Sequence, residues 1–98
     1  MAETFNVAVV GATGAVGETM LEILHQRNLP LGRVHAVASS RSAGKRVAFG
    51  DRYLVVEDLD EFDFSDIDIG LFSPGAAISK IHAPRAAAAG CVVIDNTS

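Results

Sequence analysis

Residues 7–17 constrain the fold of this chain more than any other stretch. They read V-A-V-V-G-A-T-G-A-V-G, an apolar run that meets three glycines spaced three apart. Gly11 lets the backbone leave a strand in a conformation that a Cβ atom would resist, and Gly14 lets a phosphate group approach the main chain closely. Gly17 permits close packing between that strand and a following helix. Because the N-terminus of such a helix offers free N–H groups to an anion, the pattern predicts a phosphate-binding turn.

The residues on both sides of this turn predict a strand before it and a helix after it. Phe5 and residues 7–10 are apolar, which is typical of a strand buried on both faces of a parallel sheet. After the turn, side chains recur at helical spacing as far as Asn28. They are Val16, Met20, Ile23, Leu24 and Arg27, with Glu18 and Glu22 on the other side. A strand-to-helix turn that binds no ligand is the alternative, because glycine triplets also occur by chance.

Length and composition restrict the class of protein. The chain has 98 residues, of which 49% are hydrophobic, and a formal net charge of −4. This length suits one small domain but is small for a complete two-substrate enzyme. The weak negative charge argues against nucleic acid or an anionic membrane as a partner. The chain has a single cysteine, no secretory signal and no apolar run of roughly 18 residues, so we expect a cytoplasmic protein.

A second strand is predicted at residues 34–38, after a connector at residues 29–32 that contains proline and glycine. The loop that follows lies beside the adenosine ribose in dinucleotide-binding folds, where an acid accepts hydrogen bonds from the 2′-hydroxyl. Here no acid occurs between residues 23 and 50. The loop instead carries the donors Ser40, Arg41 and Ser42. These donors suit a 2′-phosphate and favour NADP over NAD, with a solvated surface loop as the alternative.

The rest of the chain predicts four more strands, an acid-rich connector and a second helix. Residues 47–49 and 53–56 predict a hairpin at the sheet edge, and residues 67–72 and 91–94 predict two buried strands. The connector at residues 57–68 holds many acids but no histidine, which indicates a solvated face more than a metal site.

A second helix is predicted from Ala76 to Ala89, with Gly90 as its cap. Pro84 removes one backbone hydrogen bond, so we expect a kink or a break into two short helices near His82.

The alternation of strands and helices predicts an α/β fold, a Rossmann-type doubly wound, mainly parallel sheet with helices on both faces. Ligands of such sheets bind outside the carboxyl ends of the strands. We therefore expect residues 11–16, residues 39–42, residues 73–75 and Asn96 to converge on one crevice. Residues 1–98 are accordingly predicted to form a dinucleotide-binding domain.

Four separated motifs are specific when taken together. They are V-A-V-V-G-A-T-G-A-V-G, S-S-R-S-A-G-K, D-I-G-L-F-S-P-G and A-P-R-A-A-A-A-G-C-V-V-I-D-N-T-S, and they extend through the whole chain. In this order they closely resemble the N-terminal NADP-binding domain of aspartate-semialdehyde dehydrogenases. The resemblance implies an oxidoreductase that reduces aspartyl 4-phosphate to aspartate semialdehyde with NADPH, on the route to lysine, threonine and methionine.

The resemblance also implies roles for single residues. The family's cofactor residues correspond to Thr13, Gly14, Ala15 and Val16 at the pyrophosphate, to Arg41 and Ser42 at the 2′-phosphate, and to Gly75 and Asn96 near the nicotinamide. The catalytic cysteine, the histidine and the substrate arginines of the family would follow Ser98, so these 98 residues alone are expected to be inactive. The family forms dimers or tetramers mainly through its other domain, and exposed apolar surface with weak association is expected here.

Two related interpretations stay open from the sequence. The parent protein is either this dehydrogenase, the similar reductase that acts on an N-acetylglutamyl phosphate, or an NADP-binding paralogue without catalytic residues. Cys91 is not expected to be the family's nucleophile, because it opens an apolar strand at its amino end, opposite the crevice. A thiol in apolar surroundings keeps its proton, so Cys91 is predicted to be structural.

Overall fold

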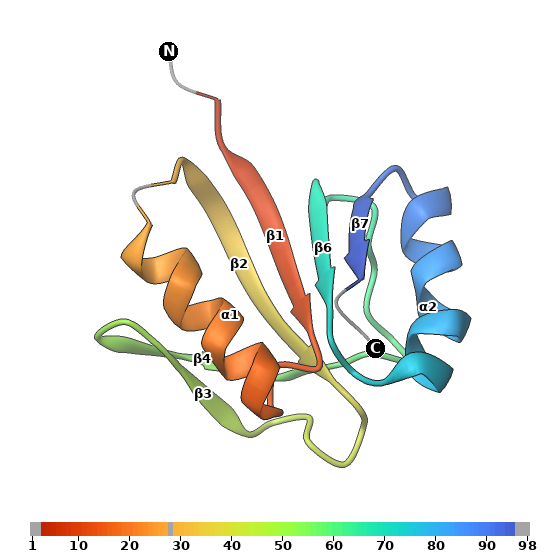
Figure 1. Ribbon diagram of the computed structural model, residues 1–98, viewed down its shortest axis with the longest axis horizontal. Helices are drawn as coiled ribbons and strands as arrows, with labels where there is room; N and C mark the ends of the chain where they lie inside the picture. The colour runs from red at the N-terminus through yellow and green to blue at the C-terminus, as the bar shows by residue number, and fades with distance from the viewer. Residues whose placement is uncertain (1–2, 28, 96–98) are drawn as a thin grey trace.

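The computed structural model describes residues 3–27 and 29–95 of the chain (Figure 1). In chain order the elements are β1 (Phe5–Val10), α1 (Ala15–Gln26), β2 (Leu31–Ala38), β3 (Arg46–Phe49), β4 (Arg52–Val55), β5 (Glu57–Asp58), β6 (Ile69–Phe72), α2 (Ala76–Ala88) and β7 (Val92–Asp95). Neither described helix is long and apolar enough to cross a membrane.

Five of the strands form one sheet in the order β5-β2-β1-β6-β7, and every pair in it is parallel. The chain builds outward from β1 to β2 and β5 on one side, and then from β6 to β7 on the other. The direction of winding therefore switches between β1 and β6. This arrangement confirms the predicted Rossmann-type sheet, and crevices at such a switch point are where ligands of these sheets bind.

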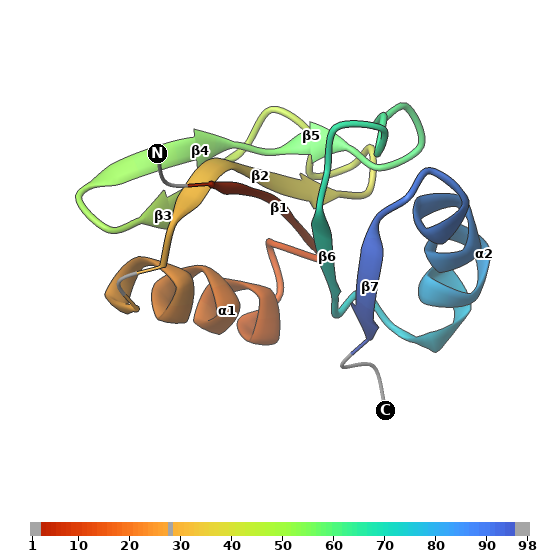
Figure 2. The same ribbon diagram turned by 90° about the horizontal axis from the view of Figure 1, so that it is seen from above.

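The two helices cover opposite faces of the sheet (Figure 2). Alternate residues of β1 supply the two cores, because successive side chains of a strand point to opposite faces. Val7 and Val9 belong to the core beneath α1, while Ala8 and Val10 belong to the core that includes Ala86 of α2. β1 is therefore buried on both faces, as its continuous apolar run predicts.

α1 turns a different side to the sheet from the one predicted. Its buried residues are Gly17, Leu21 and Leu24, whereas Val16 and Ile23 are 46% and 45% exposed. A Cβ atom at position 17 would collide with the backbone of the preceding turn. The helix can approach that turn only with its glycine facing inward, and this contact fixes the rotation of the whole helix about its axis.

β2 begins three residues before the predicted start, inside the segment expected to be a connector. Phe5 donates its N–H to the carbonyl oxygen of Pro30 at 2.9 Å, and the N–H of Arg33 donates to Oδ1 of Asn6 at 2.9 Å. Pairing with β1 thus extends β2 back to Leu31 despite the proline and glycine there. A long-range partner has overridden a local turn signal.

The predicted hairpin forms as β3 and β4, but it is not at the edge of the main sheet. The two strands make a separate antiparallel sheet that packs on α1. Val47 and Phe49 of this sheet belong to the core beneath α1. The ring of His25 meets that of Phe49 edge-on at 5.4 Å between centroids. The edge position belongs to β5, where Glu57 pairs with Val37 of β2.

α2 is one continuous helix, so the predicted break into two is wrong. Pro84 lies on its exposed side, where water can satisfy the carbonyl group that the proline leaves without a donor. Gly90 caps the helix as predicted, with a φ of 95°. Its N–H donates to Ala87 and that of Cys91 donates to Ala86, at 3.0 and 3.1 Å. This pair of bonds is the Schellman motif.

Candidate cofactor site

A cleft of about 220 Å³ lies where the carboxyl ends of β1, β2 and β6 meet. It lies at the switch point of the sheet, where the sequence predicts a crevice. From the predicted segments it brings together Gly11, Thr13, Gly14, Ser39, Ser73 and Pro74. The prediction that these three segments converge is therefore confirmed, although they come from distant parts of the chain.

Gly11 and Gly14 occupy the first turn for different structural reasons. Gly11 has a φ of 88°, and a Cβ atom there would lie 2.9 Å from the backbone nitrogen of Pro74. Gly14 has an ordinary φ of −84°, and a Cβ atom there would lie an unstrained 3.5 Å from the nearest atom, the carbonyl oxygen of Gly11. The fold requires glycine at position 11 but not at position 14. What Gly14 provides is open space beside the backbone of the cleft.

The N-terminus of α1 adjoins this space. Gly14 is the N-cap residue and makes no side-chain cap hydrogen bond. The first helical residues, Ala15 and Val16, are exposed, and the N–H of Glu18 donates to the carbonyl oxygen of Gly14 at 2.9 Å. A helix start without a side-chain cap, beside a cleft, leaves backbone donors and the positive end of the helix dipole for an anionic ligand.

The serine-rich loop after β2 closes on the glycine turn. The hydroxyl of Thr13 donates to Oγ of Ser42 at 3.5 Å, and the N–H of Ser42 donates to the carbonyl oxygen of Ser39 at 2.9 Å. Ser40 and Arg41 are exposed on the same turn. The loop therefore presents one guanidinium and several hydroxyl groups next to the start of α1.

The other wall of the cleft comes from the start of α2. The N–H of Ser73 donates to the carbonyl oxygen of Val10 at 2.9 Å, which seats the second turn against the first. Gly75 is the exposed N-cap residue of α2 and has a φ of 105°. The predicted Asn96 lies outside the residues that the structure describes.

Three lining residues are absent from the sequence-based prediction, namely Ala38, Leu59 and Ile78. Ala38 is the last residue of β2, and Ile78 follows the turn glycine Gly75 by three residues. Both could therefore have been predicted from their positions next to the predicted turns. Leu59 has no comparable signal, because it lies in the acid-rich connector. It is held there by a backbone hydrogen bond of 2.7 Å from its N–H to the carbonyl oxygen of Ala38.

Cys91 lies away from this cleft, at the amino end of β7. Its side chain is buried, and burial raises the pKa of the thiol above its ordinary value, with the nearby Asp68 carboxylate adding to the effect. Both causes favour the protonated thiol. The environment is that of a structural cysteine.

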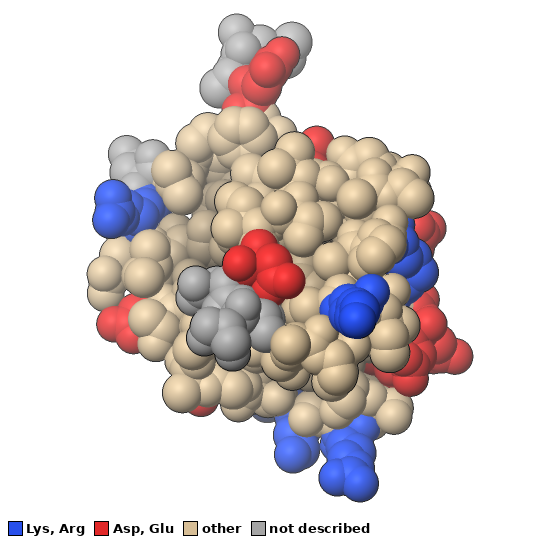
Figure 3. Space-filling model, turned by 45° about the vertical axis from the view of Figure 1, so that its right-hand side comes forward, with Lys and Arg blue, Asp and Glu red and all other residues tan. Residues whose placement is uncertain are grey.

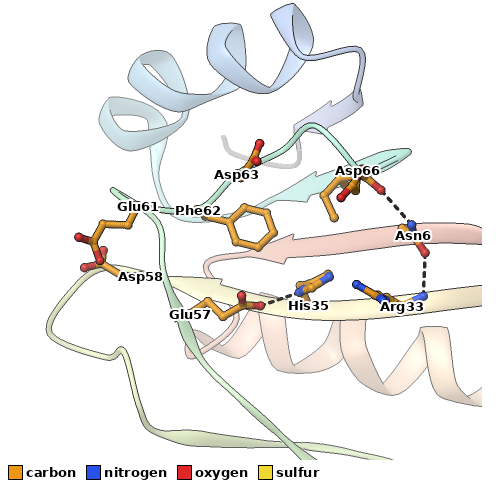
Figure 4. A pocket seen from close by; sticks show the side chains of 10 residues that line it. Asn6, Arg33, His35, Glu57, Asp58, Glu61, Phe62, Asp63 and Asp66 are labelled. Atoms are coloured by element: carbon orange, nitrogen blue, oxygen red, sulfur yellow. Dashed lines mark hydrogen bonds and ion pairs between the residues drawn. The ribbon is translucent and has the colours of Figure 1, made fainter.

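A larger cleft of about 490 Å³ lies on the sheet face opposite α1 (Figure 4). Figure 4 shows the side chains of His35 and Glu57 facing each other, with 2.6 Å between Nδ1 and Oε2. Asn6 bridges the backbones of Arg33 and Asp66 at 2.9 Å each. These polar groups bind one another. Among residues 3–27 and 29–95, no group of three or more histidine, cysteine or acidic side chains is placed to hold a metal ion.

The chain is similar to known proteins over nearly all of its length. Residues 6–98 match the family described as semialdehyde dehydrogenase, NAD-binding domain. The chain is 60% identical over 98 residues to an aspartate-semialdehyde dehydrogenase of Legionella pneumophila, covering 100% of this chain and 28% of that protein. It is 50% identical over 95 residues to a USG-1 protein homolog of Pseudomonas aeruginosa, covering 97% and 28%.

A solved structure agrees in both fold and sequence. Aspartate-semialdehyde dehydrogenase II of Vibrio cholerae, complexed with ASA, superimposes with a TM-score of 0.92 at 52% identity, covering 98% of this chain and 31% of that one. The chain thus spans less than a third of each of these three proteins. The match over residues 6–98, together with this superposition, shows that the chain belongs to the semialdehyde dehydrogenase NAD-binding domain family.

Proposed function

We propose that residues 1–98 form the NADP-binding domain of an aspartate-semialdehyde dehydrogenase, the oxidoreductase that reduces aspartyl 4-phosphate to aspartate semialdehyde. The observation that carries the proposal is the cleft at the switch point. Gly14 leaves space open in this cleft, although the fold itself does not require glycine at that position. Similar relatives bear the dehydrogenase name, which favours this function over a reductase of N-acetylglutamyl phosphate. NADPH, when bound, supplies the hydride.

The pyrophosphate would occupy the space beside Gly14. Backbone N–H groups at Ala15 and Val16 lie in the first turn of α1 and suit phosphate oxygens, since the helix dipole adds positive potential there. Thr13 adds a hydroxyl group, and Gly11 shapes the turn that aims it. In this position the chain orients the dinucleotide without using a lysine.

The 2′-phosphate would lie against Ser40, Arg41 and Ser42. The hydrogen bond between Thr13 and Ser42 supports this proposal, because it joins the loop to the glycine turn and the ribose of such folds is bound after β2. A guanidinium offers forked, charge-assisted hydrogen bonds to a phosphate, which NAD lacks. We therefore propose NADP as the preferred cofactor.

The nicotinamide would point toward Gly75 and Asn96, at the other side of the switch point. In this proposal residues 1–98 orient the cofactor, and Cys91, which is buried away from the cleft, is not the nucleophile. The substrates of the parent enzyme would be aspartyl phosphate, or aspartate semialdehyde and phosphate. We place that enzyme in the cytoplasm as a homo-oligomer, with neither nucleic acid nor membrane as a partner.

Calorimetric titration of the chain with NADP and NAD tests the proposal. We expect tighter binding of NADP, and Arg41→Ala should weaken NADP binding by about tenfold to a hundredfold while leaving NAD little changed. Lys45→Ala, which removes an exposed charge three residues after Ser42, is the matched control and should change both affinities little. Equal losses for the two cofactors in Arg41→Ala would show that Arg41 does not contact the 2′-phosphate.

A further inference from the structure

The wall of the cleft beside β2 comes from a segment with little regular structure. Leu59 lines the cleft and is 3% exposed, yet it lies just after β5, a strand of two residues. Residues 59–68 then cross the sheet face near α2 before β6 begins (Figure 2). Its N–H is bonded to the last residue of β2, and a second connection joins its carbonyl oxygen to α2.

Arg85 of α2 makes that connection. Its Nη2 donates to the carbonyl oxygen of Leu59 at 2.7 Å, and its Nη1 donates to the carbonyl oxygen of Phe62 at 2.6 Å. The guanidinium also lies over the ring of Phe64, 4.9 Å from the centroid. One planar cation thus binds both ends of the turn at residues 59–62, which a single ammonium group cannot do with the same geometry.

His82 and Asp60 reinforce the same junction. Nη2 of Arg85 donates to Nδ1 of His82 at 3.1 Å, and Nε2 of His82 lies 3.6 Å from Oδ1 of Asp60. The histidine therefore orients the guanidinium from the helix side and meets the connector on its other nitrogen. The contacts form one small network between α2 and residues 59–64.

The same helix also lines the opposite part of the cleft. Ile78 lies seven residues before Arg85, so the two share one face of α2. α2 therefore contributes Ile78 to the cleft directly and holds Leu59 through Arg85. The Leu59 wall is therefore tied to the helix that carries Ile78 by the bonds of one guanidinium, in addition to the bond between Leu59 and Ala38.

We propose that Arg85 is a positioning residue for the adenosine half of the cofactor, an inference that rests on the proposed function. The adenosine half belongs on the β2 side, since the ribose is bound after that strand, and Leu59 is hydrogen-bonded to the last residue of β2. By fixing Leu59, Arg85 sets the width of the space in which the adenosine packs. Arg85 does not line the cleft and needs no contact with the ligand.

The test compares Arg85→Met with Lys80→Met, which removes a cation from an exposed position of the same helix. Calorimetric titrations with NADP and with adenosine 2′,5′-bisphosphate are run at a temperature where circular dichroism shows every variant fully folded. A merely structural role lowers stability but leaves the affinity of the folded molecules unchanged. We expect Arg85→Met to weaken both ligands by about threefold to tenfold and Lys80→Met to weaken neither.

A second variant keeps the inference testable if Arg85→Met does not fold. Arg85→Lys retains the charge and the aliphatic stem but reaches only one of the two carbonyl groups, so an intermediate loss of affinity is expected. If the wild-type chain binds NADP and the folded Arg85 variants bind it with the same affinity, this inference alone is overturned. Failure of the wild-type chain to bind NADP would overturn the proposed function as well.

Discussion

Gly14 and Gly17 belong to the same turn, but the fold itself needs only one of them. A Cβ atom at Gly17 would collide with the backbone of Gly11 and Ala12, whereas one at Gly14 would make an ordinary contact of 3.5 Å. Gly17→Ala should therefore lower the free energy of unfolding by about 1 to 3 kcal/mol through overpacking. Gly14→Val should leave the chain folded and abolish binding of both cofactors, because the branched side chain fills the pyrophosphate space.

Thermal unfolding and NADP titration of these two variants measure the two effects separately. A folded Gly14→Val variant with unchanged affinity for NADP would contradict the assignment of the turn. A Gly17→Ala variant as stable as the wild type would contradict the packing argument.

His82 gives the stability of the chain a defined pH dependence. Burial lowers the pKa of His82 below its ordinary value of 6.5, and the Arg85 guanidinium lowers it further, while the Asp60 carboxylate opposes both. Because the folded chain binds this proton less readily than the unfolded chain does, the contribution of His82 is complete above about pH 6.5 and is lost as the pH falls below that value.

Urea unfolding of the wild type and of His82→Gln, each at pH 5 and pH 7.5, isolates this contribution. The wild type should lose more stability between pH 7.5 and pH 5 than the variant, since both share all other titrating groups. An equal loss in the two proteins would show that His82 does not titrate in this way. His25→Gln is the matched control, because His25 lies on α1 away from this network.

At the scale of elements, Asn6 joins three segments that the sequence keeps apart. Its Oδ1 accepts from the N–H of Arg33 at 2.9 Å, its Nδ2 donates to the carbonyl oxygen of Asp66 at 2.9 Å, and its N–H donates to Oδ2 of Asp68 at 2.8 Å. The side chain thereby ties the start of β2 and the connector before β6 to β1.

Asn6→Ala should lower the free energy of unfolding by about 1 to 3 kcal/mol, because two backbone groups lose their partners. Asn6→Asp keeps the acceptor for Arg33 but sets a carboxylate oxygen against the carbonyl oxygen of Asp66, so it should also be destabilising. Hydrogen exchange of the Arg33 amide should quicken in Asn6→Ala alone. If that amide exchanged at the wild-type rate, the bridge would not be what holds the start of β2.

At the scale of the whole molecule, the sheet is covered unevenly. α1 covers β1 and β2, but on its side of the sheet the β7 side chains Val92 and Ile94 are 61% and 50% exposed. Val16 and Ile23 of α1 are also half exposed. The face that carries β7 and α2 is largely uncharged, with most charged groups toward its margins (Figure 3).

We expect this exposed apolar surface to cause weak self-association of the chain, as exposed patches commonly do. The double variant Val92→Thr/Ile94→Thr should reduce association in sedimentation velocity while changing the free energy of unfolding by less than about 0.5 kcal/mol for each exposed substitution. Val9→Thr, at a fully buried position of β1, is the contrasting control and should be strongly destabilising. If the double variant associates as strongly as the wild type, Val92 and Ile94 do not form the surface that causes self-association.

The sequence by itself determined both helices and every described strand except β5, which lies in the predicted connector, and it determined where the glycine turn lies. These features follow from local chemistry: an apolar run buried on both faces, glycine where φ is positive at Gly11 and Gly90, and polar turns after each strand. Because the five strands of the main sheet are parallel, their carboxyl ends meet at one edge, so the convergence of the three turns could be inferred from order alone.

Only the tertiary structure decided which faces meet. α1 buries Leu21 and not Ile23 because Gly17 must face the preceding turn, and the β3–β4 hairpin packs on α1 because β5 takes the sheet edge. Leu59 lines the cleft, where its N–H is bonded to Ala38 and its carbonyl group to Arg85, both distant in sequence. Such contacts depend on pairs of residues far apart in the chain, and local spacing does not encode them.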